Sequence, residues 1–119
     1  MKYLMLVYFN EAEWNLLPEE EHRRRRAEFD DYSRRMAESG KLIDGWPLHP
    51  SPTATTIRSR HGRLEQVDGP FAETKEQLVG YFLMEATDLD EMLRLAAECP
   101  GHRYGTLEVR PVAPRSDGA

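Results

Sequence analysis

The sequence predicts an α+β domain with the split βαβ, or ferredoxin-like, topology. Two segments, Lys2 to Phe9 and Val79 to Ala86, carry apolar residues on both alternating faces, which is typical of central strands covered on both sides. The elements follow one another as β-α-β, a hairpin, then β-α-β. In that topology the first and third core strands lie at the centre of the sheet, so the apolar pattern and the element order agree.

The first helix is predicted to run from Pro18 to Gly40. Pro18 suits the first helical position, where a missing N–H costs nothing, and the three glutamates that follow favour a helix N-terminus. Gly40 is a typical stop. Residues 10–17 before the helix are expected to form a loop. The stripe expected to pack on the sheet is Phe29, Tyr32 and Met36, with Ala37 beside it.

An edge strand and an inserted β-hairpin arm are predicted next. Lys41 to Leu48 forms a short strand, and Asp44-Gly45 and the following prolines favour a bulge or an edge position. After a turn at Ser51-Pro52, two strands are expected from Ala54 to Arg60 and from Arg63 to Val67. We expect much of this arm to be polar.

The second half begins with a capping box at Asp88-Leu89-Asp90-Glu91. It opens a helix that Pro100-Gly101 ends, and Gly105 to Pro111 then alternates as a strand with one wet face. Residues 1–112 therefore form a single domain, and residues 113–119 are expected to be a flexible C-terminal tail. The apolar stripe expected on this second helix is Leu89, Met92, Leu93 and Ala96.

Two helices can cover only one face of a four-stranded sheet, so the second apolar face needs another cover. A second copy packed face to face across a two-fold axis would supply it and would leave a cavity between or beside the sheets. We therefore expect a homodimer with a possible small-molecule ligand.

Composition excludes several classes of function. The chain has 119 residues, 39% of them hydrophobic and 31% charged, and no apolar run approaches membrane-spanning length. The net charge of −5 argues against a direct nucleic-acid surface. The run Arg23 to Arg26 would wrap around a helix and has acidic neighbours at pairing distance, which indicates a salt-bridged face. A single cysteine fits a reducing compartment, so a cytoplasmic protein is expected.

Known catalytic and nucleotide-binding motifs are missing from the sequence: it has no GxGxxG, P-loop, HExxH or GxSxG. Cys99-x-x-His102 resembles half a metal site but lacks a second ligand pair, so neither a metal nor a cofactor is expected. His22 and His61 are expected to be solvated. His49, near the edge strand, is the best histidine candidate for a pocket.

The stretch from Asp68 to Phe82 brings charge to the start of a core strand. If residues 72–77 are extended, Glu73 and Lys75 project to one face and Thr74 and Glu76 to the other. Neighbouring charge at a cavity could tune a carboxylate for proton transfer. The predicted catalytic residues are Asp68, Glu73, Lys75 and Glu76, and the predicted ligand-binding residues are His49, Arg58, Tyr81 and Arg110.

A structural interpretation of the same stretch stays open. Asp68 would cap its own turn, Phe71 would fill the core, and the charged residues would pair across a dimer contact or face water.

The run Asp-Gly-Pro-Phe-Ala-Glu-Thr-Lys-Glu at residues 68–76, followed by a Gly-aromatic strand, resembles the signature of the DGPF group of YCII-related proteins. The resemblance extends from about Met1 to Val112 and implies the dimeric α/β-barrel fold. Relatives with a proposed enzymatic role use a histidine within the first helix and an aspartate near its end. Those positions fall near Phe29 and Glu38 here, so that dyad is not carried over.

Two hypotheses for function follow. The first is a cofactor-free acid-base isomerase or lyase that acts on a small organic acid, by analogy with the muconolactone-isomerase-like branch of the fold. The second is a non-catalytic ligand-binding or protein-interaction module, which the association of relatives with alternative sigma factors would link to transcription control. Whether the chain is an enzyme is left open.

Overall fold

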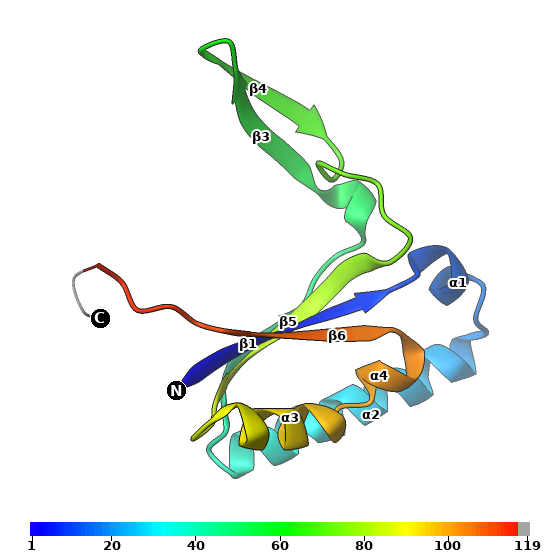
Figure 1. The fold of residues 1–119 in the computed structure, drawn as a ribbon. Coiled ribbons are helices and arrows are strands. Elements are labelled where there is room, and N and C mark those ends of the chain that lie inside the picture. Colours follow the sequence, from blue (N-terminus) through cyan, green and yellow to red (C-terminus); the bar gives the residue numbers. More distant parts are fainter. Residues whose placement is uncertain (117–119) are drawn as a thin grey trace.

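A computed structural model describes residues 1–116 and has a four-stranded antiparallel sheet with the strand order β2-β5-β1-β6 (Figure 1). A separate hairpin, β3-β4, stands away from that sheet. The elements in chain order are β1 Lys2–Phe9, α1 Glu11–Asn15, α2 Glu19–Glu38, β2 Leu42–Pro47, the 3-10 turn η1 Ser51–Thr53, β3 Thr55–Arg60, β4 Arg63–Asp68, β5 Gln77–Glu85, α3 Leu89–Ala97, α4 Gly101–Tyr104 and β6 Thr106–Pro111.

The predicted central strands are confirmed, because β5 and β1 lie between β2 and β6. Met5 of β1 pairs with Phe82 of β5 and with Val109 of β6, so these three side chains share one face. The edge position of β2 and the irregularity near Asp44 are also confirmed, since its register with β5 shifts between Leu42 and Asp44.

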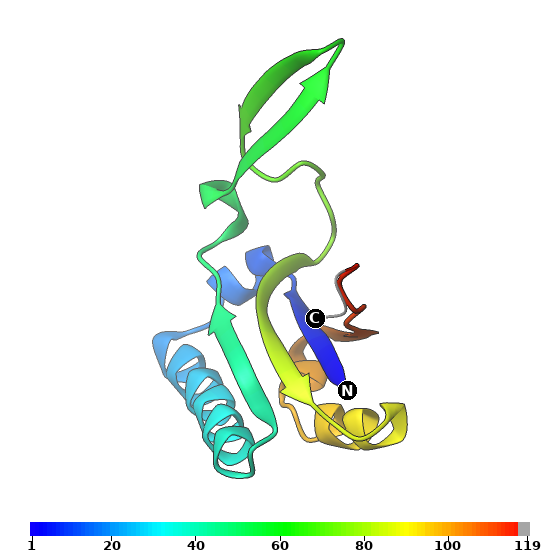
Figure 2. The ribbon, with the colours of Figure 1, turned by 90° about the vertical axis from the view of Figure 1, so that its left-hand side faces the viewer.

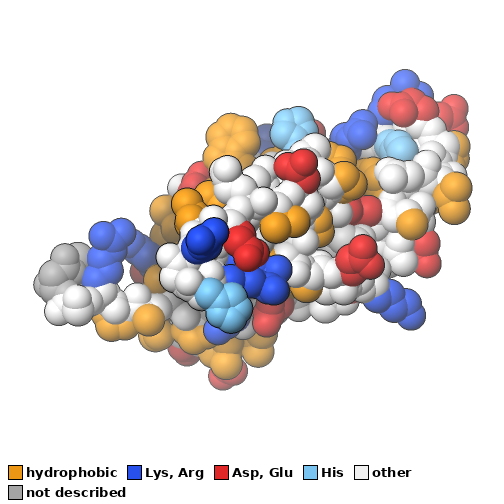
Figure 3. Space-filling view, turned by 90° about the horizontal axis from the view of Figure 1, so that it is seen from above, with side chains coloured by type: hydrophobic (Ala, Val, Ile, Leu, Met, Phe, Trp, Pro, Cys, Tyr) orange, Lys and Arg blue, Asp and Glu red, His pale blue; other side chains and the backbone are white. Residues whose placement is uncertain are grey.

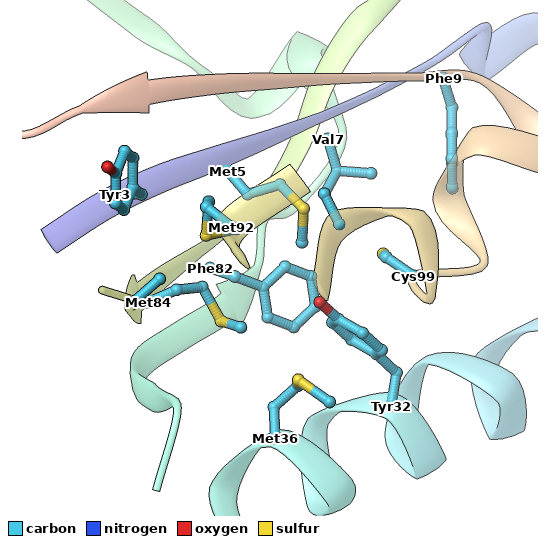
Figure 4. Packing of buried hydrophobic residues seen from close by; sticks show 12 residues of the cluster. Tyr3, Met5, Val7, Phe9, Tyr32, Met36, Phe82, Met84, Met92 and Cys99 are labelled. Atoms are coloured by element: carbon cyan, nitrogen blue, oxygen red, sulfur yellow. The ribbon is translucent and has the colours of Figure 1, made fainter. Parts of the chain in front are cut away.

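The helices α2, α3 and α4 all lie on one side of the sheet, as Figures 1 and 2 show from two directions. The core fills the space between them and the sheet. Tyr32 and Met36 of α2 point toward Phe82 and Met84 (Figure 4), and all four side chains are buried. The Tyr32 hydroxyl donates a hydrogen bond to the Leu95 carbonyl at 2.9 Å, so this buried polar group is satisfied. The α+β, ferredoxin-like fold predicted from the sequence is therefore confirmed.

The segment 10–17 is not the expected loop, because it contains the short helix α1. The Asn10 side chain accepts a hydrogen bond from the Glu13 amide at 3.0 Å and caps this helix, and the first turn is acidic. An asparagine followed by acidic residues is a typical helix start, and this signal predicts α1 better than the polarity of the segment does.

The stripe predicted on the second helix is half correct. Met92 and Ala96 are buried, but Leu89 and Leu93 are about half exposed, and Leu95 packs against the core instead. Met92, Leu95 and Ala96 follow the i, i+3, i+4 spacing of a helix face. Ala37 on α2, which was predicted beside the packing stripe of that helix, is likewise exposed.

The arginine run is salt-bridged, as predicted. Arg24 and Arg25 both bond to the Glu21 carboxylate, and Arg24 reaches Glu28 at 3.1 Å. Hydrogen bonds from these two arginines lower the pKa of Glu21 to about 2. Two of the four arginines, Arg24 and Arg25, are therefore closely paired along α2, whereas Arg26 reaches Glu19 only at 4.0 Å and Arg23 takes part in none of the ion pairs described within residues 1–116.

The hairpin arm, residues 55–68, extends well beyond the rest of the molecule (Figures 1 and 2). The radius of gyration is 16.4 Å, compared with roughly 13.5 Å for a compact chain of this length. His61 and Gly62 both have positive φ, 51° and 77°, as a two-residue hairpin turn requires.

Two further predictions concern the C-terminal tail and membrane-spanning segments. Of the predicted tail 113–119, residues 113–116 form neither helix nor strand, and 117–119 lie outside the described residues. Among the helices of residues 1–116, not one is long and apolar enough to span a membrane.

Candidate ligand-binding cleft

A cleft of about 570 Å³ lies on the helix side of the sheet, between the N-terminal half of α2 and the edge strand β2. This volume suits a small organic molecule. Its walls come from α1, α2, the sheet and the segment after β2. The apolar residues that line it are Val7, Phe9, Trp14, Phe29, Trp46, Pro47, Leu48, Pro50, Val79 and Phe82.

One side of α2 supplies a polar stripe to this apolar cleft. The stripe consists of His22, Arg26, Asp30 and Ser33, which lie three or four residues apart and therefore on one side of the helix. Phe29 lies beside the stripe and also lines the cleft. A bound molecule would therefore meet an apolar surface and a row of polar groups together.

His22 is held in place rather than solvated, which corrects the expectation from the sequence. Its ring stacks on Trp14 with centroids 4.9 Å apart, and its side chain is only 14% exposed. Nε2 lies 2.6 Å from the Trp14 carbonyl oxygen. Because a carbonyl oxygen only accepts hydrogen bonds, Nε2 carries the proton. The other nitrogen, Nδ1, lies 3.8 Å from the Glu19 carboxylate.

Asp30 and Arg26 have weaker attachments than their neighbours on α2. Asp31 pairs with Arg35 at 3.0 Å and Glu28 pairs with Arg103, whereas Asp30 takes part in none of the ion pairs formed within residues 1–116. The ion pair of Arg26 with Glu19 has a distance of 4.0 Å and is solvent-exposed, so it contributes little. A carboxylate and a guanidinium at this cleft are thus available to a ligand.

The four predicted catalytic residues lie away from this cleft. Asp68, Glu73 and Lys75 are exposed, Glu76 is half-buried, and none of the four is among its lining residues. Residues 70–76 do not form a strand, so the expected alternation of Glu73 and Lys75 against Thr74 and Glu76 is wrong. The Thr74 hydroxyl donates to the Glu76 carbonyl instead and folds the chain back locally.

The motif has structural contacts of its own. Glu76 accepts a hydrogen bond from the Thr106 hydroxyl at 2.7 Å, which joins the start of β5 to the start of β6. Lys75 lines a second hollow at the base of the arm. Phe71 is 82% exposed, so the interpretation that it fills the core is wrong.

The four predicted ligand-binding residues are dispersed. Tyr81 contributes to the cleft lining, and its hydroxyl donates to Asp44 at 3.0 Å, a hydrogen bond that raises the pKa of Tyr81. His49 is exposed between two residues that line the cleft. Arg58 lies on the arm, 3.9 Å from Glu65. Arg110 lies on β6, opposite Leu4.

Glu11 connects the cleft to the base of the arm. Its carboxylate lines the cleft and accepts hydrogen bonds from the amide, at 2.9 Å, and the hydroxyl of Ser51 in η1. Its own amide donates to the side chain of Gln77, the first residue of β5, at 2.8 Å. Both chain segments that lead into the arm are thus attached to α1.

The Cys99 and His102 pair makes no metal site in the structure. Cys99 is fully buried, and burial raises the pKa of its thiol to about 11. The His102 ring lies 3.0 Å from the Ala97 carbonyl. No cluster of three or more metal-ligating side chains occurs in the part of the chain that the structure describes.

The strand order and the helices on one sheet face place this chain among small ferredoxin-like α+β proteins, and its cleft lies between α2 and the edge strand β2. Residues 1–116 match the YCII-related domain, and the chain belongs to that family. It is 37% identical over 115 residues to an uncharacterised protein of Rhizobium meliloti, covering 95% of this chain and 93% of that protein.

A solved structure with a similar fold is the 5-chloro-2-hydroxyhydroquinone dehydrochlorinase of Burkholderia phenoliruptrix in complex with 2,5-dihydroxybenzoquinone. The TM-score is 0.57, the sequence identity is 14%, and the alignment covers 100% of both chains. At this identity the similarity establishes the fold alone.

The residues that the sequence reasoning missed are Trp14, His22, Arg26, Asp30 and Ser33. A signal was present, because His22, Arg26 and Asp30 recur at four-residue spacing beside the apolar stripe of the same helix. The denser group of ionisable residues at 68–76 lies instead at the base of the arm.

Proposed function

We propose that the chain is a cofactor-free acid-base isomerase or lyase that acts, in the cytoplasm, on a small organic acid with a flat apolar body. The observation that carries the proposal is the polar stripe of α2 on an apolar cleft, with Arg26 and Asp30 weakly engaged. Titratable groups beside an apolar pocket are the usual setting for such chemistry.

The chemistry assigns one role to each polar group. The Arg26 guanidinium would hold the substrate carboxylate by paired N–H donors. Asp30, one helical turn further on, would remove a proton from a substrate carbon. The electron pair of the broken C–H bond would form a C=C bond. In a lyase a leaving group departs from the neighbouring carbon with the electron pair of its bond. In an isomerase the electrons of an existing double bond shift to another carbon, and that carbon takes the proton back from Asp30.

Ser33 and His22 have supporting roles in this scheme. The Ser33 hydroxyl would donate a hydrogen bond to an oxygen that gains negative charge. His22 positions Trp14 by stacking and by its hydrogen bond, and Trp14 provides a flat surface for the substrate. The dehydrochlorinase with the similar fold supports a small ring as substrate and an elimination as the reaction.

The proposed quaternary state is a homodimer through the open face of the sheet. Leu4, Leu6, Tyr8 and Leu83 of β1 and β5 are only half-buried on that face, opposite the helices. An apolar sheet face needs a cover. The motif residues Asp68, Glu73, Lys75 and Glu76 take part in catalysis only if a second copy brings them to the cleft, since they do not line it in their own chain.

The test is a binding titration of small aromatic acids by calorimetry, followed by a search for turnover of each binder. Arg26→Gln should weaken binding of a carboxylate by about tenfold or more, the loss of a charge-assisted hydrogen bond. Asp30→Asn should retain binding and lose turnover. The matched control is Arg23→Gln, an exposed arginine of the same helix that does not line the cleft.

Equal affinity in the Arg26→Gln and wild-type proteins would contradict the proposed carboxylate anchor. Binding that needs Arg26, without turnover of any binder, would favour the alternative, a non-catalytic ligand-binding module built on the same cleft.

A further inference from the structure

The hairpin arm exposes more apolar surface than its own chain can cover. Ile57 is 59% exposed, Leu64 is 71% exposed, and Phe71 in the following loop is 82% exposed. No residue of the buried core described within 1–116 comes from the arm. Both edges of the two-stranded sheet are unpaired over that same range. A lone two-stranded hairpin is marginally stable in water, so the arm needs a partner.

The register of the arm separates an apolar face from a charged face. Ile57 pairs with Gln66 and Ser59 pairs with Leu64, so Ile57 and Leu64 are diagonal neighbours on one face. The other face carries Arg58 and Arg60, which share the Glu65 carboxylate at 3.9 and 3.7 Å. The face with Ile57 and Leu64 has no such pairing and is free for a partner.

The arm points to the same side as the open face of the sheet. In Figures 1 and 2 it projects away from α2 and α3, which lie on the opposite side of the sheet. Figure 3 views the molecule from the side of the arm and shows hydrophobic side chains exposed among charged ones. A body that packs on the open sheet face would therefore lie beside the arm.

The charge of the arm is opposite to that of the rest of the chain. The arm contains three arginines, Arg58, Arg60 and Arg63, and two carboxylates, which gives it a net charge of +1. The whole chain has a net charge of −5, so the remaining residues sum to −6. Arg60 lies directly opposite Arg63 in the hairpin, a like-charge pair that an acidic partner surface would relieve.

We propose that the arm clasps a second copy of this chain. Ile57, Leu64 and Phe71 pack on the partner body. The arginines lie on the opposite face of the arm, at the rim of that contact, where they add long-range attraction to the net negative charge of the partner. The inference rests on the homodimer proposed above and adds to it a contact that the sheet faces alone do not supply. A second copy fits best because one two-fold axis would apply the same clasp twice, with the basic arm of each copy on the acidic body of the other.

The experiment is sedimentation velocity over a range of concentrations for the wild type and three variants. Ile57→Glu with Leu64→Glu tests the arm, Leu6→Glu tests the open sheet face, and Leu16→Glu is the matched control. Leu16 is 85% exposed at the end of α1 and lies outside both surfaces. Circular dichroism confirms that each variant is folded before its assembly is compared.

The expected result is a wild-type dimer whose Kd rises about tenfold or more in the arm variant, since central apolar contacts carry most interface energy. Leu16→Glu should leave Kd unchanged. A wild-type dimer with an unaltered Kd in the arm variant would overturn the clasp and leave the dimer intact. A wild type that is monomeric at every concentration would overturn both. Neither outcome bears on the binding titration of the cleft.

Discussion

The body of this protein, which is the four-stranded sheet with its helices, and the hairpin arm share the same alternating strand pattern. The apolar side chains of the body are buried, whereas those of the arm are exposed. In the body, Met5 and Met84 on neighbouring strands are completely buried under the helices. In the arm, Ile57 and Leu64 alternate with polar residues in the same way and are 59% and 71% exposed. Alternation of apolar and polar residues therefore predicts a strand. Whether the apolar face of that strand is buried depends on whether another element packs against it.

Two glycines provide the strongest test of this contrast. A Cβ at Gly105 in the body would lie 2.0 Å from the Tyr8 carbonyl oxygen, a clash with backbone. A Cβ at Gly62 in the arm meets open space, and only its φ of +77° opposes alanine. We expect Gly105→Ala to lower the free energy of unfolding by about 3 kcal/mol or more, and Gly62→Ala by about 1 kcal/mol. Urea denaturation measures both.

If Gly105→Ala and Gly62→Ala lowered the free energy of unfolding equally, the contrast between a packed body and an exposed arm would be contradicted. The turn of the arm would then lie in a packed environment.

Truncation of apolar side chains should give the next largest difference. Met84→Ala removes a side chain with no exposure and should cost about 3 kcal/mol through lost burial and a cavity. Leu64→Ala should change the stability by less than about 0.5 kcal/mol in the isolated chain. Urea denaturation at a low protein concentration gives the comparison.

At a higher concentration the cost of Leu64→Ala should grow if a second copy covers the arm. A large cost for Leu64→Ala at low concentration would show instead that the arm packs on its own body.

The smallest expected effect is on the alkaline side of the stability curve. Burial raises the pKa of Cys99 in the body from 9.0 to about 11. Between these values the unfolded chain has lost the thiol proton and the folded chain retains it, so stability falls as the pH rises. Cys99→Ala should make melting temperature less dependent on pH between about 9 and 11. Thermal melts from pH 8 to 11 measure the slope.

Tyr32→Phe is the companion variant, because burial also raises the pKa of Tyr32 well above 10.0. An unchanged slope in Cys99→Ala would contradict the burial of this thiol.

The fold could be predicted from the sequence because the hydrophobic pattern of a long periodic segment indicates which of its faces are buried. Lys2 to Phe9 and Gln77 to Glu85 are apolar on both faces and are the central strands. The predicted capping box is half confirmed: the Glu91 amide donates to the Asp88 side chain at 2.8 Å, but the Glu91 carboxylate accepts from the Thr87 amide, at 2.9 Å, one residue before the N-cap. The five residues of α1 were missed because a helix this short shows little periodicity.

The candidate site was harder to predict because four distant segments build it. Periodicity places Arg26 and Asp30 on one side of a helix, but only the packing of α2 against the edge strand makes that side a cleft wall. The motif at residues 68–76 carried the densest group of ionisable side chains, yet its backbone lies in an exposed loop. Charge density in a sequence does not report burial, and burial is what a pocket requires.

The hydrogen bonds of Glu11 link the base of the arm to the wall of the cleft. One carboxylate is tethered to the segment that enters the arm, and the adjoining amide is tethered to the segment that leaves it. Glu11 also begins the helix that carries Trp14 into the cleft wall. The two segments at the base of the arm and the Trp14 wall of the cleft are therefore joined through one residue, so fixing the arm should also restrict the movement of α1.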